Sequence, residues 1–334
     1  MARIAVNGLG RIGKLLLRNL TDAGDEVVLV NEPAADAAGL AHLMEFDSLH
    51  GRWAGPVGHA GGALLLGGRR VRLTGERTIA ALPLAEEGVA VAVDCTGAFR
   101  TAARLAPYGA AGVQKVVVSA PVRDGGALNI VRGVNDHLYD GSQALVTAAS
   151  CTTNCLAPVV KVLHDGVGIR HGSITTIHDV TNTQTIVDRP AADLRRARSA
   201  LLNLIPTTTG SAAAIGLVFP ALAGRIDGHA VRVPLLNASL TDCVFEVARP
   251  TTVEEVNALF AAAAAAGPLS GILGFETRPL VSSDYRGDPR SAIIDAGATM
   301  VVNGTQVKLY AWYDNEWAYA CRLAEITRMV AQDL

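Results

Sequence analysis

Short apolar runs alternate with helix-like stretches through the first 150 residues of the chain. The runs are rich in Val, Ala, Leu and Ile, which is typical of parallel strands buried on both faces of a sheet. The stretches 13–22 and 101–109 have helical character instead. This β-α-β order predicts an open, doubly wound α/β sheet. Its strands are expected at residues 3–6, 27–30, 89–94, 115–119 and 144–148.

The pattern changes after about residue 150, where longer segments alternate apolar and polar residues. Such alternation is typical of antiparallel strands with one covered face. Residues 253–266 have helix propensity and end at Gly267-Pro268. This half is predicted to be an α+β domain with a mostly antiparallel sheet. Strands are expected at residues 173–178, 229–234, 238–247 and 304–312, with a final helix near 318–332.

The chain has 334 residues, enough for two domains of roughly 100–200 residues each. Half of the residues are hydrophobic and 18% are charged, so the chain can bury a sizeable core and is not disordered. We place a nucleotide-binding domain at 1–150, completed by a C-terminal helix at 316–334. A catalytic domain is expected at 151–315.

The charge balance excludes a dedicated nucleic-acid binder, because 29 basic and 31 acidic residues leave a net charge of -2. No apolar run approaches the roughly 18 residues of a membrane helix, and the first residues enter a strand pattern without a signal peptide. The five cysteines form neither a disulfide framework nor a zinc-binding pattern. We therefore expect a cytoplasmic protein without a metal site or membrane insertion.

A glycine-rich motif, Gly8-Leu9-Gly10-Arg11-Ile12-Gly13, follows the first predicted strand and begins the first helix. Its glycines permit a tight turn and let a pyrophosphate approach the helix N-terminus. Glu32, after the second strand, would hydrogen-bond the adenosine ribose and repel a 2′-phosphate, which favours NAD over NADP. The motif predicts a Rossmann domain, although Glu32 is also compatible with a solvated turn before Pro33.

Cys151 lies where a predicted strand meets a predicted helix. The helix N-terminus stabilises a thiolate, and a nearby imidazole can lower the thiol pKa and carry its proton. His178, at the end of a predicted strand, is the candidate for that imidazole. The alternative for any single cysteine is an inert buried thiol, and we assign that alternative to the others: Cys95, Cys155, Cys243 and Cys321.

The motifs resemble those of the phosphorylating glyceraldehyde-3-phosphate dehydrogenases over essentially the whole chain. The Ser-Cys-Thr-Thr-Asn-Cys stretch beginning at Ser150 is highly specific to that family and its close relatives. The other matching stretches are Asn7–Gly13, Ile205–Gly210, His229–Pro234 and Trp312–Trp317.

The resemblance implies a complete mechanism. Cys151 would attack an aldehyde to give a thiohemiacetal, and His178 would accept the proton and stabilise the oxyanion. Hydride transfer to NAD would leave a thioester, which inorganic phosphate would release as an acyl phosphate, as in glycolysis. The family is typically a homotetramer.

The resemblance also implies binding residues, each carried over by position. For the cofactor they are Arg11, Ile12, Arg77, Thr96, Ser119 and Asn315. For the substrate phosphate they are Thr181, Thr183 and Arg232. For the attacking phosphate they are Ser150, Thr152, Arg195, Thr209 and Gly210.

Several residues depart from the usual family pattern. Glu32 replaces a usual Asp, and Arg189 stands where many NAD-specific relatives carry Leu. Ala318 replaces a frequent Gly. Asp179-Val180 replaces the Ala- or Ser-aromatic pair that commonly follows the catalytic histidine, and a carboxylate pointing inward there would raise the pKa of His178.

Residues 178–188 and 236–245 resemble the dehydrogenases of arsenate-resistance operons, which are coupled to an organoarsenical efflux permease. Arsenate has the shape and charge of phosphate and would attack the same thioester. The resemblance therefore implies 1-arseno-3-phosphoglycerate as the exported product. None of the anion-site residues distinguishes arsenate from phosphate.

Four alternatives remain open. They are a housekeeping glycolytic dehydrogenase, an erythrose-4-phosphate dehydrogenase that passes its thioester to water, a non-catalytic NAD-binding regulator, and a cysteine hydrolase. Arg195 and Thr209 argue against the erythrose-4-phosphate dehydrogenase, and Cys151 with His178 argues against the non-catalytic regulator. A cysteine hydrolase would leave the glycine-rich motif unexplained.

Overall fold

The computed structural model describes residues 1–122 and 124–334. It divides into two compact units. Unit 1 consists of Met1–Ile130, Asp136–Ser150 and Tyr319–Leu334. Unit 2 consists of Val131–Asn135 and Cys151–Ala318.

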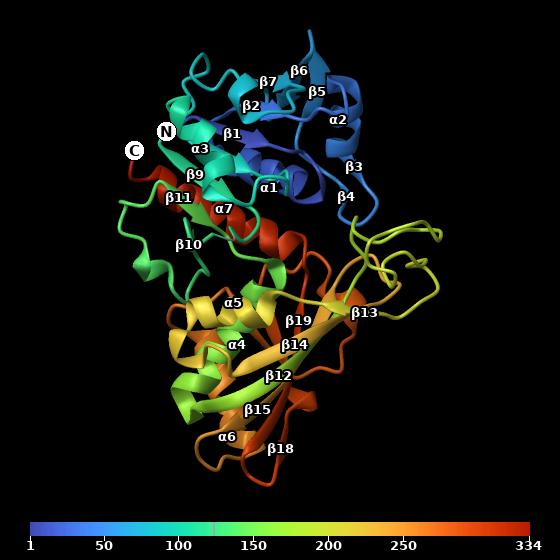
Figure 1. The fold of residues 1–334 in the computed structure, drawn as a ribbon, viewed down its shortest axis with the longest axis vertical. Helices are drawn as coiled ribbons and strands as arrows, with labels where there is room; N and C mark the ends of the chain where they lie inside the picture. Colours follow the sequence, from blue (N-terminus) through green and yellow to red (C-terminus); the bar gives the residue numbers. More distant parts are fainter. Residues whose placement is uncertain (123) are drawn as a thin grey trace. The chain divides into compact units, whose positions relative to one another are not determined.

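Unit 1 contains a nine-stranded sheet, which confirms the predicted doubly wound architecture (Figure 1). Its parallel part runs in the order β10-β11-β9-β8-β1-β2-β7. The order reverses direction on either side of β1, so the two halves of the sheet meet there. These strands are β1 (Ile4–Asn7), β2 (Val27–Asn31), β7 (Arg69–Thr74), β8 (Val91–Asp94), β9 (Lys115–Val118), β10 (Leu128–Asn129) and β11 (Leu145–Thr147).

An antiparallel extension of this sheet was not predicted. β5 (Val57–Ala60) and β6 (Ala63–Leu66) add to β7 at the sheet edge. Their sequence is interrupted by glycines and arginines, which hid the strand pattern. A two-stranded ribbon, β3 (Phe46–Asp47) with β4 (Gly51–Arg52), lies apart from the sheet pairing.

The helices of unit 1 start close to the predicted positions. α1 (Arg11–Asp22) begins two residues before the predicted start, with Gly10 as its N-cap residue. α7 (Trp317–Ala331) packs beside α1, where Arg328 binds Asp25 and the backbone of Asn19. The remaining helices are α2 (Ala37–Glu45), α3 (Ala102–Ala110), η1 (Ile79–Ala81) and η2 (Asp136–Leu138).

Unit 2 contains an eight-stranded sheet in the order β13-β14-β12-β15-β19-β17-β16, with β18 added to β19. It is mostly antiparallel, as predicted, although β12 with β14 and β16 with β17 are parallel pairs. The strands are β12 (Ile169–His178), β13 (Ile205–Thr208), β14 (Ile226–Arg232), β15 (Ser239–Val247), β16 (Leu273–Glu276), β17 (Ala292–Asp295), β18 (Met300–Val302) and β19 (Gln306–Tyr313).

α4 (Cys151–Val167) is the central helix of unit 2 and packs on β15, β17 and β19. Twelve of its 17 residues are buried, since it also contacts two further helices. These are α5 (Ser211–Val218) and α6 (Val253–Ala265), and the short helices are η3 (Pro220–Leu222), η4 (Ser282–Tyr285) and η5 (Ala296–Ala298).

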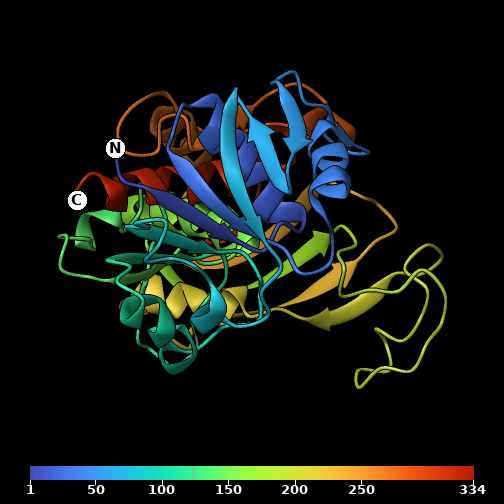
Figure 2. The same cartoon turned by 90° about the horizontal axis from the view of Figure 1, so that it is seen from above.

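A long segment, residues 179–204, connects β12 to β13 without a helix or strand of its own. Figure 2 shows it extending beyond the ends of these two strands, in yellow-green. It carries large apolar side chains that are mostly exposed: Ile186, Val187, Leu194, Leu201, Leu202 and Leu204. Exposed apolar clusters of this kind mark contact surfaces.

Candidate active site

The glycine-rich loop of unit 1 has a backbone that requires glycine at two positions. Gly8 has a φ of +92°, and a Cβ there would lie 2.9 Å from the backbone nitrogen of Thr96. A Cβ on Gly13 would lie 1.9 Å from the carbonyl oxygen of Gly8. Gly10 faces open space. The loop therefore passes tightly between two strands and leaves the N-terminus of α1 uncovered by side chains, which fits a bound pyrophosphate.

The Glu32 carboxylate is held at this loop. Its Oε2 accepts a hydrogen bond from the backbone N–H of Leu9, and its Oε1 accepts one from Ala34, both at 3.0 Å. This placement of a carboxylate beside the loop fits a ribose with two free hydroxyls. The Arg11 side chain points elsewhere, since its guanidinium forms a two-pronged ion pair with Asp47.

The other predicted cofactor residues of unit 1 follow parallel strands. Arg77, Thr96 and Ser119 lie just beyond the carboxyl ends of β7, β8 and β9, and Ile12 is the second residue of α1. Ligands of doubly wound sheets bind at this edge. The residues of unit 1 therefore fit NAD.

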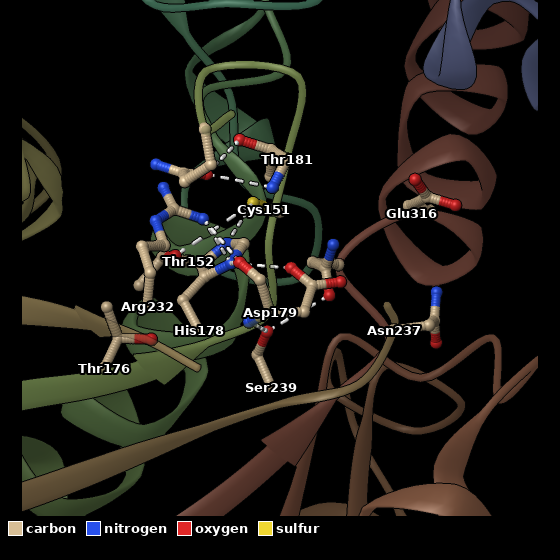
Figure 3. Close-up of polar contacts among 12 residues, drawn as sticks. Cys151, Thr152, Thr176, His178, Asp179, Thr181, Arg232, Asn237, Ser239 and Glu316 are labelled. Carbon is tan, nitrogen blue, oxygen red and sulfur yellow. Dashed lines mark hydrogen bonds and ion pairs between the residues drawn. The ribbon is translucent and has the colours of Figure 1, made fainter. Parts of the chain in front are cut away.

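Cys151 is the first residue of α4 and is half-buried. Two residues before it, Ala149 has a φ of 52°, a left-handed conformation that turns the chain into the helix. The Cys151 sulfur lies 3.7 Å from Nε2 of His178. The structure therefore brings the predicted nucleophile and the predicted proton carrier together (Figure 3).

His178 is the last residue of β12 and is buried. Arg232 lies opposite it on the parallel strand β14, with Nη1 at 2.5 Å from Nδ1 of His178. On the other side, Oδ1 of Asp179 lies 2.7 Å from the same Nδ1. Figure 3 shows the imidazole between these two side chains. The inward-pointing carboxylate considered from the sequence is therefore present.

These neighbours set the protonation of the pair. Burial raises the pKa of Cys151, but the hydrogen bond and charge of His178 outweigh it and lower the pKa below its ordinary value. Burial lowers the pKa of His178, but hydrogen bonds to Asp179 and Cys151 raise it to about 9. Both shifts favour a thiolate beside an imidazolium.

Sequence reasoning missed a hydroxyl network beneath this pair. The Tyr313 hydroxyl lies 2.9 Å from Oγ1 of Thr152 and 2.8 Å from Oγ1 of Thr176. Its ring stands edge-on to the His178 imidazole, with centroids 6.1 Å apart. Thr176 and His178 are two residues apart on β12 and so share a face. The strand alternation is the signal that indicates this arrangement.

The predicted anion-binding residues come from several separate parts of the chain. Thr181 and Thr183 hydrogen-bond to each other just after β12, near the end of the strand that carries His178. Arg195 lies in the 179–204 segment, where it is exposed and donates to the backbone of Pro206. Thr209 and Gly210 precede α5, and Thr152 is the second residue of α4. Ser150 belongs to unit 1.

Asn315 is buried just after β19. Its Oδ1 accepts a hydrogen bond of 3.1 Å from the Ser239 hydroxyl. The neighbouring Asp314 carboxylate accepts hydrogen bonds from Gly287 and from the backbone of Glu316 and Trp317 at the start of α7. A rigid turn therefore holds Asn315.

The other four cysteines lie in different surroundings. Burial raises the pKa of Cys155 to about 12 and also raises the pKa values of Cys95 and Cys243. Cys321 is buried against Asn19. Burial therefore disfavours the thiolate of Cys95, Cys155 and Cys243, in contrast to Cys151.

Within residues 1–122 and 124–334, no helix combines the length and the apolar character that crossing a membrane requires. The same residues contain no cluster of three or more side chains suited to holding a metal ion.

Comparisons with known proteins identify the family. Residues 2–102 match the NAD binding domain of glyceraldehyde 3-phosphate dehydrogenase, and residues 150–315 match its C-terminal domain. The chain is 58% identical to glyceraldehyde-3-phosphate dehydrogenase 3 of Nostoc sp., over 99% of both chains. It is 47% identical to the plasmid-encoded enzyme of Cupriavidus necator, over 97% of this chain and 96% of that one. With an NAD-binding unit and these relatives, the chain belongs to the glyceraldehyde-3-phosphate dehydrogenase family of NAD-dependent oxidoreductases.

Proposed function

We propose that the chain oxidises glyceraldehyde 3-phosphate with NAD and transfers the acyl group from Cys151 to inorganic phosphate. The observation that carries the proposal is the 3.7 Å separation between the Cys151 sulfur and Nε2 of His178. Arg232 lies opposite His178 on the neighbouring strand. A nucleophile, a proton carrier and an anion-binding group are therefore close together.

In the proposed reaction, the Cys151 thiolate adds to the aldehyde carbon while the carbonyl electrons move onto oxygen. His178 donates its Nε2 proton to that oxygen to give a thiohemiacetal. As a neutral base, it removes the same proton when the hydride leaves, and the carbon becomes a thioester of Cys151. NAD, when bound, accepts the hydride.

Acyl transfer completes the cycle. A phosphate oxygen attacks the thioester carbonyl, the C–S bond breaks, and Cys151 leaves as a thiolate. The acyl phosphate is released and the enzyme is regenerated. We propose that Thr181, Thr183 and Arg232 hold the substrate phosphate, because hydroxyl and guanidinium groups suit a dianion. The attacking phosphate is assigned to Ser150, Thr152, Arg195, Thr209 and Gly210.

Residues 1–150 with 316–334 are proposed as the NAD-binding domain, and residues 151–315 as the catalytic domain. Gly8, Gly10 and Gly13 would face the pyrophosphate, Glu32 the ribose and Asn315 the nicotinamide carboxamide. A reducing cytoplasm is the proposed location, since the reaction needs the Cys151 thiol in its reduced form.

Turnover with two aldehydes tests this function. NADH formation should require both glyceraldehyde 3-phosphate and phosphate, and Arg195→Ala should raise the KM for phosphate. NADH formation from erythrose 4-phosphate at a rate independent of phosphate would instead support the water-using relative.

A homotetramer is also proposed. Leu202 is 85% exposed and Leu194 is 80% exposed in the 179–204 segment, and such side chains are normally covered by a partner. Leu202→Asp should lower the mass measured by analytical ultracentrifugation. The matched control is Val281→Asp, which changes an exposed apolar residue outside that segment. Equal masses for both variants and the unmodified protein would contradict this role of the segment.

We further propose arsenate as an acceptor, with product export by an organoarsenical efflux permease. The support is the resemblance of residues 178–188 and 236–245 to dehydrogenases of arsenate-resistance operons. Deleting the gene should sensitise cells to arsenate and leave growth on glucose unchanged. Loss of growth on glucose with unchanged arsenate tolerance would identify a housekeeping glycolytic enzyme instead.

A further inference from the structure

Asp179 is an acidic residue buried directly beside the catalytic pair. Its exposed fraction is 0%. The backbone N–H of Asp179 donates to the Ser239 hydroxyl at 3.2 Å, and its carbonyl oxygen accepts from Nη1 of Arg232 at 2.9 Å. Because neighbouring residues hold the backbone on both sides, the side chain is directed inward, where Oδ1 lies 2.7 Å from Nδ1 of His178.

Three groups face Nδ1 of His178, and one of them, the backbone carbonyl oxygen of Asp179, is an acceptor 2.9 Å away that also accepts from Nη1 of Arg232. The Arg232 guanidinium, at 2.5 Å, is a donor only, and it would favour an unprotonated Nδ1. That tautomer of the neutral imidazole carries its proton on Nε2 and cannot accept a proton from Cys151. The Asp179 carboxylate is an acceptor only, and it favours a protonated Nδ1. Nε2 is then the acceptor facing the sulfur.

We propose that Asp179 is a positioning residue for His178, so that Cys151, His178 and Asp179 act as a relay in which the carboxylate holds the Nδ1 proton. The inference rests on the proposed acyl transfer at Cys151. With Nδ1 already protonated, His178 can also become an imidazolium. When Nε2 takes the proton of Cys151, the imidazolium donates to the sulfur on one side and to the carboxylate on the other.

The charges around the pair are consistent with this role. A Cys151 thiolate, a His178 imidazolium, an Asp179 carboxylate and an Arg232 guanidinium sum to zero. Further groups also act on these four. Tyr313 faces Cys151 and Arg232, Asn315 and Glu316 face Asp179, Arg196 faces Arg232, and the Thr152 hydroxyl lies 4.0 Å from the Cys151 sulfur. Hydrogen bonding to Asp179 is the largest of the three interactions that raise the pKa of His178 against burial; the other two are the hydrogen bond and the charge of Cys151.

Two substitutions separate positioning from packing. Asp179→Asn keeps the shape but presents an amide N–H to Nδ1, which enforces the wrong tautomer. Asp179→Ser removes the carboxylate without adding that donor. We expect kcat to fall about tenfold in Asp179→Ser and a further tenfold or more in Asp179→Asn, with the KM for the aldehyde unchanged within about twofold. A purely structural role predicts a larger loss in Asp179→Ser, because Asn is closer than Ser to Asp in size and shape.

The pH dependence of Cys151 alkylation by iodoacetamide gives a readout that needs no turnover. With the labelled site mapped by mass spectrometry, the midpoint of the acid limb should move up in Asp179→Ser and further in Asp179→Asn, because the imidazolium that stabilises the thiolate is lost. The Asp179 charge by itself raises the pKa of Cys151, so a simple charge effect would move the midpoint down and would contradict the proposal. The control is Asp242→Asn, which changes an acidic residue on β15 that binds Lys308. Unchanged midpoints in both Asp179 variants would overturn the proposal.

A measurement on the unmodified protein covers the case in which the variants do not fold. The ¹⁵N spectrum of labelled histidine at a pH of about 10 reports the neutral tautomer, and comparison with His178→Asn assigns the signal. Protonation on Nδ1 is expected, whereas protonation on Nε2 would refute the proposal. Absence of NADH formation would refute the proposed function alone, since neither alkylation nor the spectrum depends on it.

Discussion

Asp47 of unit 1 and Asp179 of unit 2 are both buried carboxylates beside a positive side chain, with exposed fractions of 2% and 1% for the side chains. Burial raises the pKa of Asp47, but hydrogen bonds from Arg11 and the backbone of His50 and Leu49 outweigh it and hold the pKa well below its usual range. Burial also raises the pKa of Asp179, and His178 opposes that rise only in part.

The difference lies in the partner. A guanidinium never loses its proton under working conditions, so the Arg11–Asp47 pair keeps its charges and stabilises the chain next to the glycine-rich loop. An imidazole exchanges its proton readily, so the His178–Asp179 pair can change its protonation state. In the proposed reaction, unit 1 uses an ion pair for structure and unit 2 uses one for proton transfer.

Removing the proton carrier should have the largest effect. His178→Asn is expected to reduce kcat by about 10²–10⁴-fold, the range typical of a lost general base, and Cys151→Ser to abolish acyl transfer. NAD binding measured by calorimetry should persist in both. If His178→Asn lowers kcat by less than Asp47→Asn does, the contrast between the two units fails.

The cofactor preference should change next most. Glu32→Ala removes the carboxylate that repels the 2′-phosphate of NADP, and we expect the ratio of kcat/KM for NAD over NADP to fall by about tenfold or more. Arg189→Leu should change that ratio less. Equal kcat/KM for the two cofactors in the unmodified protein would show that the charge of Glu32 does not control preference.

Deprotonation of His178 should lower kcat/KM by about tenfold for each pH unit above its pKa. Its folded-state pKa of about 9 lies above the ordinary value of 6.5, so stabilisation by its charge is complete below the ordinary value and is lost as pH rises through 9. The kcat/KM for the aldehyde should fall above about pH 9, because the oxyanion then lacks its proton donor. A profile still rising at pH 10 would contradict the assignment.

The smallest effect is expected for Asp47→Asn, which should reduce the free energy of unfolding by roughly 1–3 kcal/mol. Because the folded-state pKa of Asp47 is depressed, its contribution is present above the ordinary value of 3.8 and is lost as pH falls below it. The thermal unfolding temperatures of the unmodified protein and of Asp47→Asn should therefore differ at neutral pH and converge in strong acid. A constant difference across that range would argue against an ion-pair origin.

Much of the fold and the central chemistry could be predicted from the sequence because their signals are local. The apolar runs of β1 and β8 are typical of buried parallel strands wherever they occur. Gly8 and Gly13 satisfy a backbone requirement within a few residues of the chain. The stretch around Cys151 indicates a nucleophile at a helix start. His178 is a candidate partner from its place at the end of a predicted strand, and the family resemblance strengthens that pairing.

Tertiary structure alone decided how distant strands pair. The parallel pairing of β12 with β14 places Arg232 opposite His178, and the pairing of β15 with β19 places Ser239 opposite Tyr313. The sequences of the strands do not determine either register, because the alternation of apolar residues sets which face is buried but not which strand pairs alongside. The contact between Thr176 and Tyr313 depends on the pairing of β15 with β12 on one side and with β19 on the other.

The role of Asp179 shows the same division most clearly. From the sequence it was a carboxylate next to a histidine, whose direction was open. Adjacent residues on a strand point to opposite faces, so proximity along the chain does not bring two side chains together. Here β12 ends at His178. The Asp179 backbone N–H donates to Ser239 and its carbonyl accepts from Arg232, and these two hydrogen bonds hold the side chain toward the imidazole. The sequence determined which ionisable groups the site contains, and the tertiary structure determined which nitrogen of His178 each of them faces.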